Sequence, residues 1–472
     1  MATSRPASDH RARLAVAWLI PLALGAAVSF APQVLNDGDT FWHVAAGRWM
    51  IAHASVPATD PFSFTFLGRP WMAHEWLSEV AMGAAWTAAG WAGVMLLTGL
   101  AAGALAAVMA NWLLRWLAPL SATMALALGL ACVAPGLLAR PHMLVLPALA
   151  LWTVGLLKAR REGRAPSPWL ALLLALWANL HSSFIVGLLV AAAFALEAAL
   201  DVKAWRPRAL AGWAAFLALS AVATLATPHG LAGLAFPLKV LNMKTLAVIT
   251  EWQGPDFMKL SPLEIALIGA LFVSFWKGVR LTAVRAALLV GLTHMTFQHV
   301  RQEVLLGVVG PLILAEPLGR ALGRGEAAAW RAPWSEALVA GALCAALVVA
   351  RLASPQVRAD GPTAPVTALA QVPAALKTQP VLNDYDFGGY LIFEGVRPYI
   401  DGRADMYGDA FVADDDAIQR GTQGLIDAAI KRYDIRWAIL RPDRPLVGAL
   451  EHMPGWREIY RDKVAVVVAK SG

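Results

Sequence analysis

Long apolar runs separated by short polar stretches repeat along the first three quarters of the chain. Runs of about 17–25 apolar residues are long enough to cross a bilayer as helices. We expect a break near Gly90 in the second run, and polar residues at 179–183 divide the run at 168–200 into two. The pattern predicts a polytopic α-helical membrane protein with about eleven spans, at 13–32, 80–111, 118–137, 142–158, 168–180, 183–200, 209–227, 262–277, 281–297, 302–319 and 334–352.

The pattern changes after the last apolar run. Residues 353–380 are rich in Pro and Ala and indicate a linker, and residues 381–472 are typical of a small α/β domain. A helix is expected at 415–433, because the carboxylates at 414–416 suit a helix N-terminus. The expected strands lie at 380–385, 389–394, 397–401, 435–440 and 463–469. We therefore predict a transmembrane domain at 1–352, a linker at 353–380 and an α/β domain at 381–472.

Composition supports this division. Of the 472 residues, 58% are hydrophobic and 15% are charged, whereas about a quarter of the residues in ordinary soluble domains are charged. The net charge of +7 does not indicate nucleic-acid binding, because the basic residues lie mostly in short loops between spans, where they set orientation. Cys132 and Cys344 lie inside apolar runs and indicate neither a disulfide framework nor a metal site.

Basic residues also predict the orientation. Arg5, Arg11 and Arg13 precede the first apolar run and favour a cytoplasmic N-terminus. This run could also be a signal peptide, but it is long for one and the chain behind it stays hydrophobic, so a retained helix is favoured. Eleven spans then place the C-terminal domain in the periplasm. The expected location is a bacterial inner membrane, with membrane lipids as partners.

Under this topology, the chemically unusual segments all lie on the periplasmic side. Polar and ionisable groups at membrane depth are costly and usually functional, so we expect them to line a single cavity. The loop at 33–79 is long and rich in carboxylates, histidines and tryptophans, and is the predicted active-site loop. The other segments are A-R-P-H at 139–142, A-N-L-H at 178–181, A-T-P-H-G at 226–230, E-W-Q-G-P-D-F at 251–257 and H-V-R at 299–301.

This arrangement resembles the GT-C class of membrane glycosyltransferases, which includes oligosaccharyltransferases, protein O-mannosyltransferases and the aminoarabinose transferases of lipid A. The resemblance is closer to a bacterial branch of GT-C-like proteins and covers nearly the whole chain. Several GT-C families have an adjacent Asp-Glu pair, which is here replaced by Asp37-Gly38-Asp39. The motifs that carry the resemblance are D-G-D-T-F-W-H-V-A-A-G, D-P-F-S-F-T, G-R-P-W with H-E-W-L, A-R-P-H, W-A-N-L-H-S-S-F, E-W-Q-G-P-D-F, N-D-Y-D-F-G-G-Y-L and Y-I-D-G-R-A-D-M-Y-G.

The resemblance implies that a sugar moves from a polyprenyl-phosphate carrier to a glycan, lipid or protein acceptor, with inversion. A carboxylate must then take the acceptor proton, an effect worth about 10²–10⁴-fold in rate. Cationic groups or a metal ion, here Mg²⁺ or Mn²⁺, would stabilise the departing phosphate.

Asp39 is the candidate base, and Asp37 is its substitute or a metal ligand. The alternative is structural, with a turn at 36–38 and Asp39 capping a helix that starts at Thr40. His43 lies four residues after Asp39 on the same helical face, so Asp37, Asp39 and His43 form a candidate metal site.

Two further groups could bind substrate. His74 and Glu75 could bind a metal or orient the acceptor, or they could form an interfacial belt with neighbouring tryptophans. Arg140, His142 and Arg301 are the candidate phosphate-binding residues, because Arg binds phosphate with two hydrogen bonds. The alternative for these arginines is that they extend to lipid headgroups.

The remaining candidates are polar residues near span ends. Asn179, His181 and His229 either line the cavity or make packing hydrogen bonds, and packing is favoured. Glu251 with Trp252 fits a carbohydrate subsite, or Trp252 is an ordinary interfacial tryptophan.

In the C-terminal domain, Asp401, Arg403 and Asp405 could bind the acceptor or hold the domain to the membrane part. A salt-bridged turn is the favoured reading of this cluster.

The sequence contains no P-loop, dinucleotide-binding fingerprint, Cys-based metal motif or Ser-nucleophile signature, so a cytoplasmic nucleotide substrate is not expected. A transporter or flippase of lipid-linked glycans, or an assembly component, is the alternative to an enzyme. Transporters often contain internal repeats. No repeat is visible here, which favours the enzyme.

Overall fold

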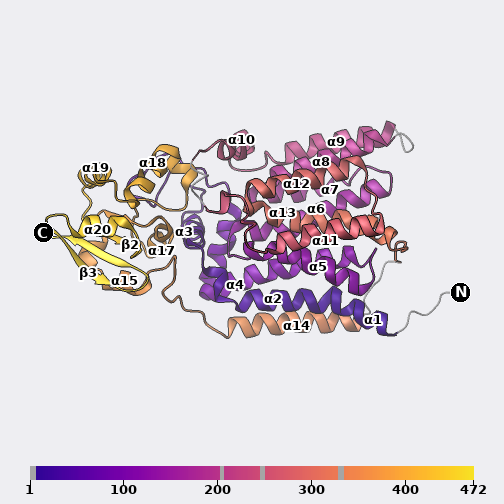
Figure 1. Cartoon of the computed structure of the whole chain (residues 1–472), viewed down its shortest axis with the longest axis horizontal. Helices are drawn as coiled ribbons and strands as arrows, with labels where there is room; N and C mark the ends of the chain where they lie inside the picture. The colour runs from indigo at the N-terminus through magenta and orange to yellow at the C-terminus, as the bar shows by residue number, and fades with distance from the viewer. Residues whose placement is uncertain (1–6, 202–206, 245–249, 328–333, 472) are drawn as a thin grey trace.

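The computed structural model describes residues 7–201, 207–244, 250–327 and 334–471. Arg5, one of the orienting arginines, lies outside these ranges. The helices run side by side in one bundle, and a small sheet lies beyond one end of it (Figure 1). The first helix, α1 (Ala7–Leu14), lies at the other end.

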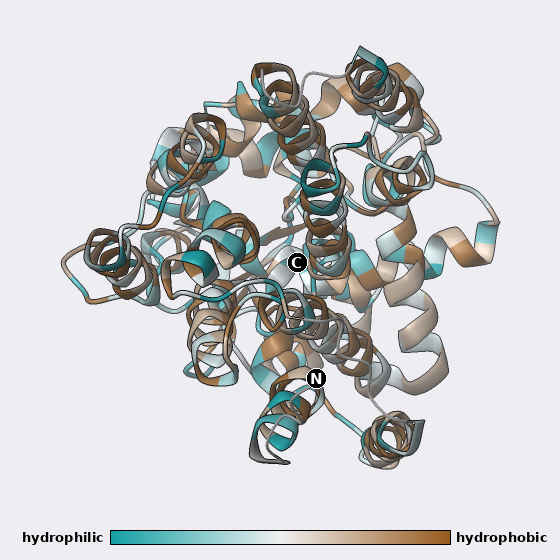
Figure 2. Ribbon diagram, turned by 90° about the vertical axis from the view of Figure 1, so that its right-hand side faces the viewer, coloured by the Kyte–Doolittle hydropathy of each residue, from teal (hydrophilic) through white to brown (hydrophobic). Residues whose placement is uncertain are grey.

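Six helices in the described ranges are long and apolar enough to cross a membrane. Figure 2 views the bundle from the end away from the sheet, and brown apolar residues cover much of the helices. These helices and their many exposed large apolar side chains point to a membrane protein. The six are α1 continuing through η1 (Ala15–Leu19) into α2 (Ile20–Phe30), α4 (Trp76–Leu113), α5 (Pro119–Val133) with η3 (Ala134–Gly136), α6 (Pro141–Arg161), η7 (Val300–Gln302) with α13 (Glu303–Ala321), and α14 (Trp334–Leu352).

Shorter helices complete the bundle. They are α7 (Trp169–Leu180), α8 (Phe184–Leu200), α9 (Pro207–Ala223), α10 (Gly230–Leu241), α11 (Pro262–Lys277) and α12 (Ala283–Gln298). The predicted break at 179–183 is confirmed by the gap between α7 and α8. The break at Gly90 is also confirmed, because α4 is kinked there and Gly90 has φ +57°. Helix α10 was not predicted.

Helix α3 (Gly38–His53) packs closely against the first turns of α4. Gly47 makes this approach possible, because a Cβ atom there would lie 1.7 Å from the carbonyl oxygen of Glu79. Gly83 faces α3 in the same way, with a Cβ position 2.6 Å from the backbone nitrogen of Arg48. Two glycines thus bring the start of α4 against α3.

The C-terminal part contains a four-stranded sheet in the order β1-β2-β4-β3. Strands β1 and β2 are parallel, and the other neighbouring pairs are antiparallel. This confirms the predicted small α/β fold. The strands are β1 (Val381–Asn383), β2 (Trp437–Leu440), β3 (Trp456–Arg461) and β4 (Val466–Lys470), and the helices are α15 (Val366–Gln371), α16 (Ala374–Lys377), α17 (Gly388–Phe393), α18 (Ala404–Gln419), α19 (Gln423–Tyr433) and α20 (Pro445–Glu451).

Several predicted elements of this part are wrong. The strand expected at 389–394 is helix α17, since a short apolar run fits a buried helix as well as a strand. Residues 397–401 do not join the sheet, because their backbone pairs with the 33–79 loop and with the side chain of Asn383. Strand β3 was missed, and the predicted helix at 415–433 is two helices separated at Gly421, where φ is +87°.

A buried ion cluster, here called the Arg403 joint, fastens the C-terminal part to the 33–79 loop. Arg403 lies 2.7 Å from Asp60 Oδ1 and 2.7 Å from Asp401 Oδ2. The Tyr407 hydroxyl donates to the same Asp401 oxygen at 2.7 Å. Asp401 and Arg403 form the salt-bridged turn that was favoured, because the Arg403 backbone nitrogen and Nε both donate to Asp401 Oδ1, at 3.1 and 2.7 Å. Through Asp60 the same arginine also holds the two parts together, which was one of the alternatives.

Candidate active site

A cavity of about 790 Å³ lies where the helical bundle meets the C-terminal part. Its walls come from α3, α6, α10, η7 and α18, and from the segments between them. Most of the predicted site residues line it, namely Asp37, Asp39, His43, His74, Glu75, Arg140, His142, His181, Glu251, Trp252 and Arg301. Residues spread over most of the sequence thus reach one cavity, as the sequence predicted.

The N-terminus of α3 carries the predicted base. Asp37 is the N-cap, and its carboxylate accepts a hydrogen bond from the Asp39 backbone nitrogen at 2.8 Å. The structural alternative therefore applies to Asp37 and not to Asp39, which lies in the first turn. The Asp39 side chain instead accepts a hydrogen bond from Trp42 Nε1 at 2.9 Å.

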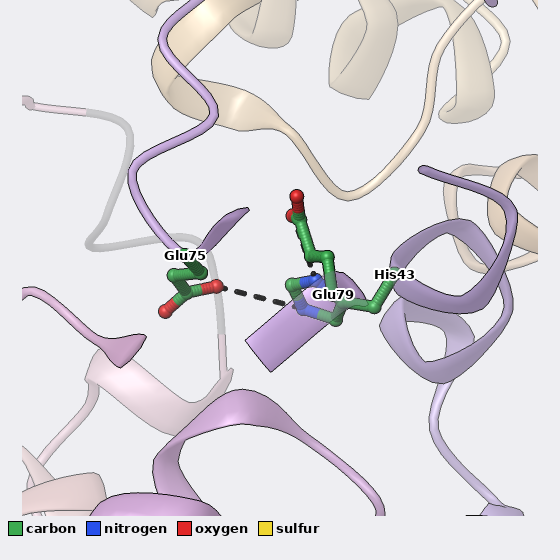
Figure 3. A group of neighbouring side chains, drawn as sticks. All are labelled: His43, Glu75 and Glu79. Atoms are coloured by element: carbon green, nitrogen blue, oxygen red, sulfur yellow. Dashed lines mark hydrogen bonds and ion pairs between the residues drawn. The ribbon is translucent and has the colours of Figure 1, made fainter. Parts of the chain in front are cut away.

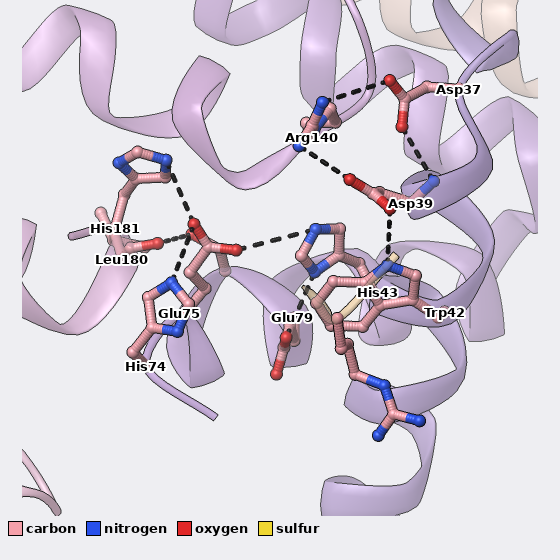
Figure 4. Close-up of polar contacts among 12 residues, drawn as sticks. Asp37, Asp39, Trp42, His43, His74, Glu75, Glu79, Arg140, Leu180 and His181 are labelled. Atoms are coloured by element: carbon pink, nitrogen blue, oxygen red, sulfur yellow. Dashed lines mark hydrogen bonds and ion pairs between the residues drawn. The ribbon is translucent and has the colours of Figure 1, made fainter. Parts of the chain in front are cut away.

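Arg140 forms ion pairs with three carboxylates. The guanidinium cluster, as it is called here, consists of Asp37, Asp39, Arg140, Glu251 and Arg301. Arg140 lies 3.3 Å from Asp37 Oδ2, 2.7 Å from Asp39 Oδ2 and 2.9 Å from Glu251 Oε2 (Figure 4 shows the two Asp contacts). Its position is set by α6, which begins at Pro141 directly after it. Arg140 is thus largely occupied by protein carboxylates.

Arg301 is the less occupied of the two arginines. Among the described residues its ion pair is with Glu251 Oε1, at 3.0 Å. The guanidinium lies 4.4 Å from the centre of the Trp252 ring, a cation–π distance. His299 Nδ1 contacts the Trp252 carbonyl at 2.6 Å and fixes the same segment.

The surroundings separate the acidities of these carboxyl groups. Burial, with the nearby charges of Asp37 and Glu251, raises the pKa of Asp39 to about 7 although Arg140 opposes the shift. Burial acts the same way on Glu251, but Arg140 and Arg301 outweigh it and lower its pKa to about 2. Asp39 is therefore a carboxyl group that changes its charge near neutral pH.

A second group, here called the histidine cluster, consists of His43, His74, Glu75, Glu79 and His181 (Figure 4). The Glu75 carboxylate lies 3.1 Å from His181 Nε2, 3.6 Å from His74 Nε2 and 3.7 Å from His43 Nε2. The other ring nitrogen of His43 lies 3.2 Å from Glu79 Oε1. His43 thus stands between two glutamates.

Charge is unevenly shared in the histidine cluster. Burial disfavours the protonated form of His74, but the Glu75 carboxylate dominates and raises the pKa of His74 to about 9. Burial also opposes ionisation of Glu75, yet His74 and His181 hold its pKa well below the usual range. Burial lowers the pKa of His43 and of His181, so these two imidazoles are neutral at pH 7. Glu75 and His74 form the ionised pair.

The other predicted residues take supporting positions. His142 Nε2 lies 2.7 Å from the Gly136 carbonyl on the cavity wall. Asn179 accepts from Trp76 Nε1 at 2.8 Å and donates to the carbonyls of Ala175 and Ala226, and it is not among the cavity-lining residues. His229 Nε2 contacts the Ala73 carbonyl at 3.1 Å, also outside the lining. Packing, the favoured reading, describes Asn179 and His229.

The candidate metal ligands fall into separate groups. Asp37 and Asp39 contact the positive charge of Arg140, whereas His43 faces Glu75 and Glu79. In the described part of the chain, His43, Glu75 and Glu79 are the group whose ligand atoms lie close enough, within 4.8 Å of one another, to hold one ion.

Sequence reasoning missed the contribution of the C-terminal part to the cavity. Gly402 faces the predicted base so closely that a Cβ atom there would lie 1.7 Å from Asp39 Oδ1. Tyr385, Asp386 and Asp405 also line the cavity. The glycine within Y-I-D-G-R-A-D was the available signal, because an acidic and basic cluster interrupted by glycine suggests a close backbone contact.

Comparison with known proteins supports the fold. No protein-family model and no curated protein matches the chain. The fold is similar to that of the oligosaccharyltransferase of Archaeoglobus fulgidus in its apo form, with a TM-score of 0.51 and 11% identity over 92% of this chain and 70% of that one. The motifs predicted a resemblance to a class that includes oligosaccharyltransferases, and the similarity of the fold to one such enzyme agrees with that prediction at the level of fold.

Proposed function

We propose that the chain is an integral membrane glycosyltransferase of the GT-C type. It takes a sugar from a polyprenyl-phosphate donor and transfers it, with inversion, to a glycan, lipid or protein acceptor. The observation that carries this proposal is Asp39, a carboxyl group with a pKa of about 7 at a cavity that Arg301 also lines. The similarity of the fold to an oligosaccharyltransferase supports the same class of reaction.

In this mechanism the bond between the sugar C1 and the phosphate oxygen breaks as the acceptor oxygen bonds to C1. Asp39 accepts the proton of the acceptor hydroxyl or amide, which requires its ionised form. The phosphate leaves with the bonding electrons, and Arg301 stabilises its charge. Arg140 holds Asp37, Asp39 and Glu251 in place, so it positions the base.

The donor sugar lies beside Glu251 and Trp252 in this proposal. An aromatic face next to a carboxylate acceptor of hydrogen bonds suits a sugar ring, and Glu251 stays ionised because its pKa is about 2. His142 and His181 line the same cavity, and in this proposal they bind the substrates.

We further propose that the protein lies in a bacterial inner membrane with a cytoplasmic N-terminus. The transmembrane domain comprises residues 1–352, and the α/β domain at 381–472 covers the cavity from the periplasm. The lipid donor then enters from the bilayer and the acceptor from the aqueous side.

The test is a transfer assay with the full chain in nanodiscs. A panel of polyprenyl-phosphate sugars is offered with membrane extract as acceptor source, with and without Mg²⁺ or Mn²⁺, and free polyprenyl phosphate is measured. We expect donor-dependent release that falls about 10²–10⁴-fold in Asp39→Asn. Asp427→Asn, an exposed carboxylate on α19, is the matched control and keeps the wild-type rate.

Two results would contradict the proposal. Full activity in both Asp39→Asn and Asp37→Asn would remove the assigned base. Carrier binding without turnover across the whole panel would favour a transporter, flippase or assembly component of lipid-linked glycans.

A further inference from the structure

Three side chains of the histidine cluster meet, one from α3 and two from the start of α4 and the residue directly before it. His43 lies on the second turn of α3, Glu75 directly precedes α4, and Glu79 lies in its first turn (Figure 3). Glu75 and Glu79 are four residues apart, so they share one face of this helix start. The close contact at Gly47 places that face against His43.

Within the described residues, one carboxylate oxygen of Glu79 has no hydrogen-bond donor. The residue is 1% exposed, and its Oε1 contacts His43 Nδ1 at 3.2 Å. Its other carboxylate oxygen is buried without a hydrogen-bond partner among the described residues. A buried carboxylate oxygen that lacks a donor costs free energy, which a bound cation would offset.

We propose that His43, Glu75 and Glu79 bind one divalent transition-metal ion of the zinc or manganese type. The ligand atoms of these residues lie within 4.8 Å of one another. The ion joins α3 to the start of α4, and so fixes the helix that presents Asp39. This site is separate from Asp37 and Asp39, and its existence does not depend on the transferase reaction.

Neighbouring side chains contact the proposed ligands and hold them in position, as is common around metal sites. His181 Nε2 lies 3.1 Å and His74 Nε2 3.6 Å from Glu75 Oε1, and these contacts orient the carboxylate towards His43. A metal-bound histidine commonly holds a carboxylate at its second ring nitrogen. His43 has a glutamate near each ring nitrogen, so one nitrogen can ligate the ion while the other donates to a carboxylate oxygen that the ion does not use.

The ligand types select the ion. An imidazole with carboxylates suits zinc, manganese or iron, whereas magnesium and calcium prefer oxygen ligands and water. The guanidinium cluster is unsuited to any of these ions, because Arg140 already neutralises Asp37 and Asp39.

The experiment is metal binding by the full chain in nanodiscs. The protein is treated with a chelator, reloaded with Zn²⁺ or Co²⁺, and analysed for metal content and for Co²⁺ visible absorption. We expect one equivalent in the wild type and an affinity about 10–100-fold lower in Glu79→Gln and His43→Gln. The controls His53→Gln, an exposed histidine at the end of α3, and Asp39→Asn should each retain the ion.

The Asp39→Asn control separates the two proposals, because it should lose transfer and keep the metal. X-ray absorption of the Co²⁺-loaded wild type gives a readout that needs no variant, and one imidazole among oxygen ligands is expected. Failure of the wild type to bind one equivalent at micromolar free Zn²⁺ would overturn the site. So would a spectrum without imidazole, or loss of the ion in Asp39→Asn with retention in His43→Gln.

Discussion

Arg140 and Arg403 each bind carboxylates from distant parts of the chain, but their surroundings differ. Arg403 contacts Asp60 and Asp401, and all three side chains are at most 1% exposed. Arg140 contacts three carboxylates whose side chains are 15–35% exposed, at the wall of the cavity. The same chemical groups are therefore sealed in one place and open to a cavity in the other.

The difference indicates which cluster can do chemistry. In the Arg403 joint, hydrogen bonds from Tyr407 and from the loop backbone complete the environment of the carboxylates, and no substrate can reach them. In the guanidinium cluster, Asp39 has a raised pKa and lines the cavity, so it can exchange a proton with a bound molecule. Access to the cavity, and not the presence of an ion pair, therefore distinguishes the guanidinium cluster from the structural Arg403 joint.

The largest effect is expected when the joint is broken. Arg403→Gln leaves Asp60 and Asp401 buried without a cation, so the free energy of unfolding should fall by about 3–5 kcal/mol. Chemical unfolding in detergent followed by near-UV circular dichroism measures this loss. The control Arg436→Gln removes a half-exposed arginine paired with Asp434 and should cost less than about 1 kcal/mol. Equal losses in the two variants would contradict the assignment of the joint.

Arg140→Gln should instead reduce transfer while it preserves most of the stability. We expect a fall of about 10²–10³-fold in kcat/KM, because Asp39 loses the charge that holds it in position and ionised. The three carboxylates border a cavity, where water can solvate them after the change. Transfer kinetics and the same unfolding measurement check both expectations. If activity falls only with the folded fraction, Arg140 resembles Arg403 and the contrast between the clusters disappears.

The smallest effect is a graded one with pH. A general base must be ionised, and the pKa of Asp39 is raised to about 7. Below pH 7, kcat/KM should fall about tenfold per pH unit as Asp39 becomes protonated, and above pH 7 it should level off. Asp37→Asn removes a negative charge that raises this pKa, so the limb should move to lower pH. A flat profile from pH 5 to 8 would exclude Asp39 as the base.

Local signals predicted much of this structure. The breaks at Gly90 and at 179–183 followed from residues that interrupt an apolar helix. Residues of the guanidinium cluster were singled out one by one, because charged groups at span ends are unusual. Their pairing was not predicted, since Arg140 reaches Asp37 and Glu251 only through the tertiary arrangement of α3, α6 and the segment before η7.

The contacts that escaped prediction depend on close backbone approach. Glu79 meets His43 because Gly47 lets two helices touch, and Gly402 meets Asp39 across the boundary between the helical bundle and the C-terminal part. A glycine in a sequence does not show which residue will pack against it. Helix α17 was mistaken for a strand because its apolar run has no clear period.

The contact between Gly402 and Asp39 also has a consequence for synthesis of the protein. The acidic end of α3 is made early, but the wall that covers it is made only after every helix of the bundle has left the ribosome. Until then the cavity lacks one wall, and Asp60 has no ion pair with Arg403. The active site of the nascent chain is therefore incomplete until the last fifth of the chain has folded onto the first fifth.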